Sequence, residues 1–118
     1  MVSPQLRALL AAAPGAGRLI GDDVRTGNAE HPVCGDRLEL DVRLADGVIV
    51  AFAWRASACP ATTAVAAAAA TCLPGKTLVT AAQELRACVQ QAGGLQVHER
   101  HAEALLLRAL QAACPGAG

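Results

Sequence analysis

The sequence has 118 residues with ten basic and ten acidic side chains, so it predicts a single domain over 1–118 with no basic field for nucleic acid. Apolar residues make up 53% of the chain and aromatic residues 2%, which indicates a core of small side chains in closely packed helices. No apolar run approaches the ~20 residues that span a membrane, so we predict no membrane association.

The first predicted element is a helix over about residues 5–13. Ser3 stands where an N-cap is expected, Pro4 takes the first helical position, and "PGAG" from Pro14 ends the segment. The short apolar run "ALLAAA" is also typical of a signal peptide, but the cap and the proline favour the helix. We therefore predict a cytoplasmic protein.

The next predicted elements are a polar loop and a β-hairpin. Residues 21–32 show no hydrophobic periodicity and are predicted to form the loop. Over 37–44 apolar and charged side chains alternate, which is the period of a strand with one solvent-facing side. "ADG" at 45–47 turns the chain, and the apolar run 48–54 returns as the second strand of the hairpin.

Three helical segments follow the hairpin. Residues 60–73 begin with proline and are rich in alanine, the residue with the highest helix propensity. Further helices are predicted over 77–92 and 98–113. The order of elements predicts an α+β fold, in which several α-helices pack on one face of a small antiparallel sheet formed by 37–44 and 48–54.

A cysteine and an aspartate flank a glycine just before the first strand, as Cys34, Gly35 and Asp36. Alone, such a triplet is most often a packed cysteine beside a turn-forming aspartate. Cys59, however, directly precedes the helix that starts at Pro60, where free backbone N–H groups and the helix dipole favour a negatively charged sulfur. A hairpin brings together the strand ends far from its turn, so these two thiols and the carboxylate are predicted to share a metal site.

The other cysteines and the histidines carry weaker signals. Cys72 and Cys88 lie in helical stretches among small apolar residues, where packed thiols without a chemical role are common. His101 is a candidate fourth ligand on the condition that its helix start adjoins the cysteines, whereas His98 is expected to be solvated. His31 is expected at most to contact the ligands.

The segment "CGDRLELDVRLADGVIVAFAWRASAC" over 34–59 resembles the signature of the U-type iron–sulfur cluster assembly scaffolds, namely IscU, SufU and the N-terminal part of NifU. These proteins carry Cys-Gly-Asp, a hairpin, and a second cysteine that opens the following helix. "PGKTL" at 74–78 is similar to the family's Gly-Lys-Ser/Thr-Leu, and the resemblance extends from about residue 5 to 113. It implies a scaffold for cluster assembly rather than an enzyme.

Carried over to this chain, the resemblance makes Cys34 and Cys59 two of the three cluster cysteines and the candidate sulfur acceptors. Asp36 matches the aspartate that ligates metal and keeps the cluster labile, and His101 matches the histidine before the third cysteine. Ala102 stands in the position of that third cysteine. The implied ligands are therefore Cys34, Asp36, Cys59 and His101, for a [2Fe–2S] cluster or iron and alternatively for Zn²⁺.

Three functions remain open from the sequence. The first is a scaffold-like protein that holds iron or a labile cluster, with a cysteine desulfurase and acceptor apo-proteins as partners. The second is a zinc-binding sulfur acceptor that works with a cysteine desulfurase and carries the persulfide on Cys59. The third is an interaction module with a degenerate site, motivated by Ala102 and by the absence of the family's Pro-rich chaperone motif before His101.

Overall fold

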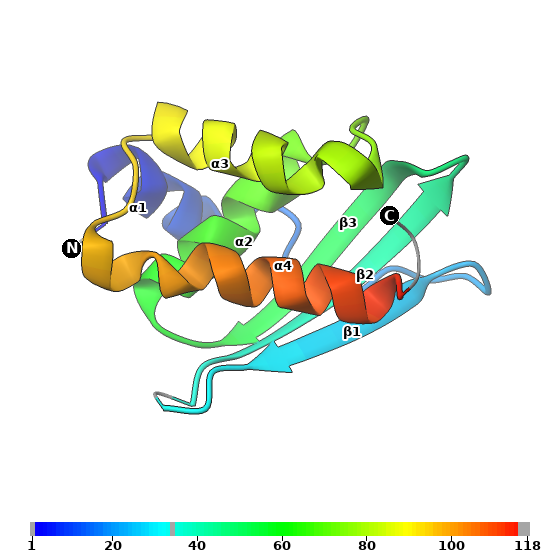
Figure 1. Cartoon of the computed structure of the whole chain (residues 1–118), viewed down its shortest axis with the longest axis horizontal. Helices are drawn as coiled ribbons and strands as arrows, with labels where there is room; N and C mark the ends of the chain where they lie inside the picture. Colours follow the sequence, from blue (N-terminus) through cyan, green and yellow to red (C-terminus); the bar gives the residue numbers. More distant parts are fainter. Residues whose placement is uncertain (1, 34, 116–118) are drawn as a thin grey trace.

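The computed structural model describes residues 2–33 and 35–115 and has a three-stranded sheet with helices packed on it (Figure 1). The strands form an antiparallel sheet in the order β1-β2-β3. The predicted α+β class is confirmed. Within the described part of the chain, no helix has the length and apolar character needed to cross a membrane. With η for a 3₁₀ turn, the elements are α1 (Pro4–Ala12), β1 (Arg25–Glu30), β2 (Arg37–Ala45), β3 (Val48–Ser57), α2 (Pro60–Cys72), η1 (Leu78–Thr80), α3 (Ala81–Gln91), η2 (Val97–Glu99) and α4 (His101–Ala113).

Helix α2 lies at the centre of the helical layer and contacts α1, α3, α4 and strand β3. Its alanines allow neighbouring backbones to approach closely, and the run Ala66–Ala69 is fully buried. Helix α4 packs across β1 and β2. The alternation in β2 gives the sheet its inner face, where Leu38, Leu40 and Val42 are buried against the helices.

The β2–β3 hairpin is closed by Asp46 and Gly47, which both have positive φ, at 53° and 78°. A two-residue hairpin turn requires this backbone conformation, and the strands resume pairing with Ala45 opposite Val48. Strand β3 continues to Ser57, beyond the predicted end at residue 54, because Arg37 at the start of β2 pairs with Ser57. The strand therefore ends two residues before Cys59.

Strand β1 was not predicted, since it lies within the segment 21–32 that was expected to be a loop. The sequence of this strand has almost no apolar side chains that could indicate a strand. The strand packs on α4 through its backbone and not through large side chains. At Gly27 an added Cβ would lie 2.2 Å from the Ala113 backbone nitrogen and 2.3 Å from the Ala109 backbone oxygen. Only glycine allows this strand and helix to meet so closely, and glycine leaves no periodic signal.

The outer face of the sheet is held by a charged group centred on Asp41, which is 3% exposed. Arg55 donates two hydrogen bonds to its carboxylate, at 2.9 and 3.0 Å. Thr26 donates a third at 2.8 Å, and the Leu19 backbone N–H a fourth at 3.0 Å. The Arg55 guanidinium, with the smaller help of the other donors, lowers the pKa of Asp41 from 3.8 to about 2.

Both predicted C-terminal helices begin differently from expectation. The segment 77–92 starts as η1, whose Thr80 backbone N–H donates to the Thr77 side-chain oxygen at 3.3 Å, and continues as α3. The segment 98–113 starts as η2 and continues as α4 from His101. In both cases a short 3₁₀ turn ends the preceding connection and sets the direction of the helix.

Candidate metal centre

The structure places Asp36 and Cys59 side by side at the end of the hairpin that is far from its turn. Because Arg37 pairs with Ser57, the residues just outside the two strands adjoin. The Cys59 backbone N–H donates to Asp36 Oδ1 at 3.2 Å. Asp36 is 7% exposed, and Cys59 is half-buried at the N-cap of α2. The carboxylate therefore accepts one of the free N–H groups at the start of α2.

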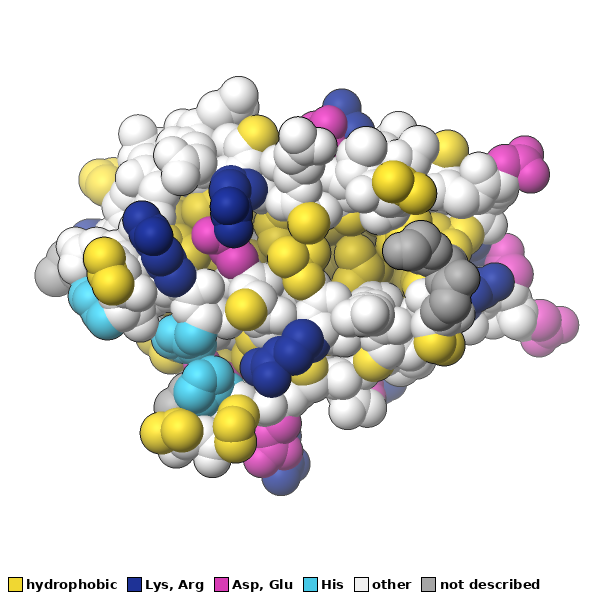
Figure 2. Space-filling view, viewed as in Figure 1, with side chains coloured by type: hydrophobic (Ala, Val, Ile, Leu, Met, Phe, Trp, Pro, Cys, Tyr) yellow, Lys and Arg dark blue, Asp and Glu magenta, His cyan; other side chains and the backbone are white. Residues whose placement is uncertain are grey.

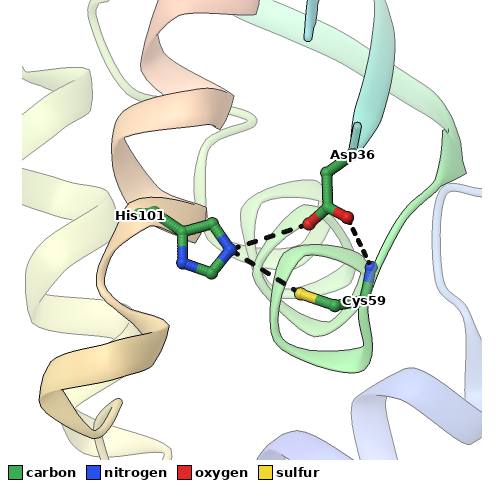
Figure 3. A group of neighbouring side chains, drawn as sticks. All are labelled: Asp36, Cys59 and His101. Atoms are coloured by element: carbon green, nitrogen blue, oxygen red, sulfur yellow. Dashed lines mark hydrogen bonds and ion pairs between the residues drawn. The ribbon is translucent and has the colours of Figure 1, made fainter. Parts of the chain in front are cut away.

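His101, in the first turn of α4, completes a group of three ligand types (Figure 3). Its Nε2 lies 3.8 Å from Cys59 Sγ and 3.6 Å from Asp36 Oδ2. Ligand atoms of the three residues all lie within 4.8 Å of one another. The residues come from three separate parts of the chain, which meet only when α4 packs beside the start of α2.

The hydrogen bond at the other ring nitrogen orients His101 for metal binding. Nδ1 lies 3.2 Å from the His98 backbone oxygen. A carbonyl oxygen only accepts, so Nδ1 carries the proton of this bond and the lone pair of the neutral ring is at Nε2. Nε2 is the nitrogen that faces Cys59 and Asp36. A hydrogen bond from the other ring nitrogen to a backbone oxygen is the usual arrangement for histidines that ligate metal.

A short capped turn positions the start of α4. Gln96 and Glu99 form a capping box in η2, in which the Gln96 backbone N–H donates to Glu99 Oε1 at 3.1 Å. His101 and Ala102 then open α4, and Ala102 is fully buried in the core. Position 102 thus contributes a packed methyl group to the helix start, and it offers no ligand atom.

Thr62 is a site residue that the sequence interpretation missed. It is fully buried, and its hydroxyl donates to Asp36 Oδ2 at 3.1 Å. The Thr62 hydroxyl oxygen also lies 3.5 Å from Cys59 Sγ. Thr62 is three residues after Cys59, so one turn of α2 places its side chain beside the cysteine. The signal in the sequence that could have indicated this residue is a hydroxyl three positions after Cys59, in a helix that is otherwise rich in alanine.

A cavity of about 630 Å³ opens beside the group of three side chains, and it gives access to two of them. Cys59 and His101 line it together with His98. Most of the remaining lining is apolar, from Val2, Leu10, Pro60 and Ala61, with Arg7 and Glu99 as charged members. A thiol and an imidazole that share an open cavity are accessible to a second molecule.

The other predicted positions have different places in the structure. The His31 ring packs edge-on against the His101 ring, with 5.1 Å between centroids, so His31 contacts a ligand candidate. The His98 side chain is exposed, and histidine side chains gather at this end of the molecule (Figure 2). Cys34 lies outside the described residues, so its predicted position at the site stays a prediction.

Two of the distances between the donor atoms fall in the range expected for a four-coordinate metal. Bonds of about 2.0–2.3 Å to nitrogen, oxygen and sulfur place neighbouring ligand atoms roughly 3.3–3.8 Å apart in a tetrahedron. The separations of 3.6 and 3.8 Å around His101 Nε2 fall in this range. Sulfur, nitrogen and oxygen donors together suit zinc, and histidine and cysteine together suit iron–sulfur ligation. The fold thus brings three suitable donors within 4.8 Å of one another, which makes the group a candidate metal site.

Solved structures share this fold at low sequence identity. A NifU-like protein (N-terminal) from Brucella abortus is 19% identical, with a TM-score of 0.63 over 92% of this chain and 76% of that one. A hypothetical protein is 22% identical, with a TM-score of 0.66 over 92% and 95%. A protein assigned as an iron–sulfur cluster assembly scaffold for the SUF system, from Fervidobacterium islandicum, is 15% identical, with a TM-score of 0.63 over 95% and 86%.

Sequence comparison places the chain in a family. No curated protein matches it at a significant level. The family model of the NifU-like N-terminal domain matches residues 14–115, which include the hairpin, α2 and the whole of α4. The match covers most of the chain and every residue of the group formed by Asp36, Cys59 and His101. The protein therefore belongs to the NifU-like N-terminal domain family.

Proposed function

We propose that this chain is an iron–sulfur cluster assembly scaffold that binds iron or a labile [2Fe–2S] cluster, as its cargo, through Cys34, Asp36, Cys59 and His101. The observation that carries the proposal is the group of three different donors within 4.8 Å, which lies in a chain of the NifU-like family. The chain then acts as a cytoplasmic carrier of iron and sulfur and not as an enzyme. Its partners are a cysteine desulfurase and acceptor apo-proteins.

The donor set supports reversible binding. Thiolate holds iron firmly, whereas a carboxylate is a harder and weaker donor in a cluster site. The carboxylate of Asp36 therefore gives up a metal ion more readily than a third thiolate would. Release to an acceptor protein requires this property.

Ala102 restricts the route of sulfur in the proposed scaffold. The buried methyl group of Ala102 accepts no sulfur, so a persulfide has to form on Cys59 or Cys34. Cys59 lines the cavity of about 630 Å³, which gives an incoming persulfide access to its sulfur. In the transfer, the Cys59 thiolate attacks the terminal sulfur of the desulfurase persulfide and displaces the desulfurase cysteine as a thiolate. We therefore assign Cys59 as the first acceptor.

Anaerobic reconstitution with iron and sulfide tests the scaffold function. The wild-type chain is expected to bind iron and to show visible charge-transfer absorption, and Cys59→Ser is expected to lose most of both. Cys88→Ser is a matched control, because Cys88 lies in α3 outside the group of three donors. A colourless wild-type product without bound iron would contradict the proposal.

A zinc-binding sulfur acceptor is the second candidate function, and the nearly tetrahedral separations around His101 Nε2 favour it. In this case zinc holds the site together and Cys59 takes sulfur from a cysteine desulfurase. The metal content of the protein, purified without oxygen, separates the two functions, since one predicts zinc and the other iron. Mass spectrometry after incubation with a desulfurase and cysteine is expected to show added sulfur on Cys59; an unmodified chain would contradict the acceptor role.

A further inference from the structure

A second pair of thiols lies away from the metal centre, between two neighbouring helices. Cys72 is the last residue of α2, and Cys88 lies in α3, which packs against α2 (Figure 1). Both side chains are half-buried. They line one cavity of about 510 Å³ on the surface, with Lys76 and Glu84 also in its wall.

The two thiols influence each other across the contact between α2 and α3. Burial first, and then the neighbouring Cys88 thiol, raises the pKa of Cys72 to about 12. Cys88 also directs its Sγ at the Ala68 backbone oxygen, at 3.7 Å, which turns the thiol towards α2. Ala68 is one helical turn before Cys72, so the Cys88 sulfur is held beside the turn of α2 that carries Cys72, and both thiols open into one cavity.

A metal ion is the weaker explanation of this pair. Structural zinc sites in proteins take four protein ligands, and catalytic ones take three. Among residues 2–33 and 35–115, the group of Asp36, Cys59 and His101 is the only set of three suitable donors close enough to share an ion. No third donor within the described part of the chain forms such a group with the pair in α2 and α3. Its chemistry is that of a dithiol.

We propose that Cys72 and Cys88 are a modification site, at which a low-molecular-weight disulfide oxidises the pair to a reversible intrachain disulfide. The Cys88 thiolate attacks the disulfide and displaces one thiolate, which leaves a mixed disulfide on Cys88. The Cys72 thiol transfers its proton to the departing thiolate and its sulfur attacks the Cys88 sulfur. Two protein thiols are oxidised and one small disulfide is reduced to two thiols, so electrons and protons balance.

The assignment of the two roles follows from their surroundings. At neutral pH Cys72 stays protonated, because its pKa is far above 7, so the first attack is made by Cys88. The product ties the end of α2 to α3 and closes the intervening segment, which includes η1, into a loop. This proposal does not depend on the function of the metal centre, and it is tested on metal-free protein.

Peptide mapping in glutathione redox buffers tests the proposal. Trypsin cleaves after Arg55 and Lys76, so Cys59 and Cys72 remain in one peptide. The full chain is therefore used with Cys34→Ser and Cys59→Ser. We expect a cross-link between the Cys72 and Cys88 peptides, and we expect C72S or C88S in this background to reduce cross-linked protein on the order of tenfold. C114S is the control, because Cys114 is a buried thiol beyond the end of α4, and it is expected to keep the cross-link.

A thiol count on the unsubstituted chain gives a readout that needs no variant. After oxidation and removal of iron and zinc, alkylation is expected to find two reactive thiols fewer than in the reduced chain, and reductant is expected to restore them. Thiols at 72 and 88 that stay reduced at oxidant levels which modify Cys114, or a cross-link that survives in C72S, would overturn the proposal.

Discussion

Among single residues, Asp36 has the most closely defined surroundings in the candidate metal centre. Its Oδ2 accepts a hydrogen bond from Thr62 and faces His101 Nε2, and its Oδ1 accepts the Cys59 backbone N–H. Thr62 is therefore a positioning residue, because it holds the carboxylate in the orientation in which one oxygen faces the other ligands.

We predict that Thr62→Val weakens metal binding by about 10–100-fold, since valine has the same shape but no hydroxyl for Asp36. Thr62→Ser restores the donor and is expected to bind within about threefold of the wild-type chain. Zn²⁺ affinity of the metal-free protein, measured by competition with a chromophoric chelator, reports the change. Thr63→Val is the matched control, because the Thr63 hydroxyl donates to the Cys59 backbone oxygen and not to Asp36. Equal affinity of T62V and wild-type protein would remove the positioning role.

The surroundings of Asp41 predict how the stability of the fold depends on pH. Its pKa is about 2 in the folded chain and 3.8 ordinarily, so the unfolded chain takes up the proton first as pH falls. The Arg55–Asp41 interaction therefore contributes its full stabilisation above about pH 4, about 2 kcal/mol, and this contribution is lost as pH falls towards 2. In urea unfolding, Asp41→Asn is expected to be less stable than wild type at about pH 6, and the gap is expected to narrow at about pH 3. Asp46→Asn, in the exposed hairpin turn, is the control; a gap that does not change with pH would contradict the assignment.

At the scale of elements, the hairpin and the helices follow from the sequence, whereas β1 does not. Strict alternation over 37–44 and the Asp46-Gly47 turn each specify the hairpin locally. Strand β1 is held by the approach of its backbone to α4 at Gly27, which depends on an element more than 80 residues later in the chain. Strands are predicted from the periodicity of their side chains, and a contact between two backbones produces no such periodicity.

Gly27→Ala tests this contact. The added methyl group would lie 2.2 Å from the Ala113 backbone nitrogen, so β1 and α4 have to separate, and we expect a loss of about 2–3 kcal/mol in the free energy of unfolding. Chemical denaturation measures the loss. Asn28→Ala, at the next and exposed position of β1, is expected to change stability by less than about 0.5 kcal/mol. Similar losses in both variants would show that the close approach does not stabilise the fold.

The difference between local patterns and tertiary contacts also determines how much of the candidate metal centre can be predicted from the sequence. Asp36 and Cys59 flank a hairpin, so its topology alone brings them together. His101 depends on the docking of α4, a tertiary contact that no local pattern in the sequence specifies. Thr62 has no pattern of its own within an alanine-rich helix. That Cys72 and Cys88 share a cavity has no signal in the sequence, because the meeting of α2 and α3 at these positions is a tertiary contact.

For the whole molecule, binding at the metal centre is expected to be linked to folding. The three donors come from the start of β2, the start of α2 and the start of α4, and an unfolded chain does not hold them together. A metal ion at about 100 times its dissociation constant is predicted to stabilise the folded chain by about 2.7 kcal/mol. Thermal unfolding with Zn²⁺ and with a chelator measures this shift, and His101→Gln is expected to reduce it. A midpoint that is the same with metal and with chelator would show that the site does not bind zinc at the concentration used.

The register of the hairpin has a consequence for the order in which the site is assembled during folding. Asp36 and Cys59 are brought together by a contact that is local in sequence, whereas His101 arrives only with the final docking of α4. A chain in which α4 has not yet docked therefore carries only a two-donor precursor of the site. The affinity for metal is expected to rise in a step when α4 docks, so metal binding reports on the packing of this helix against the rest of the fold.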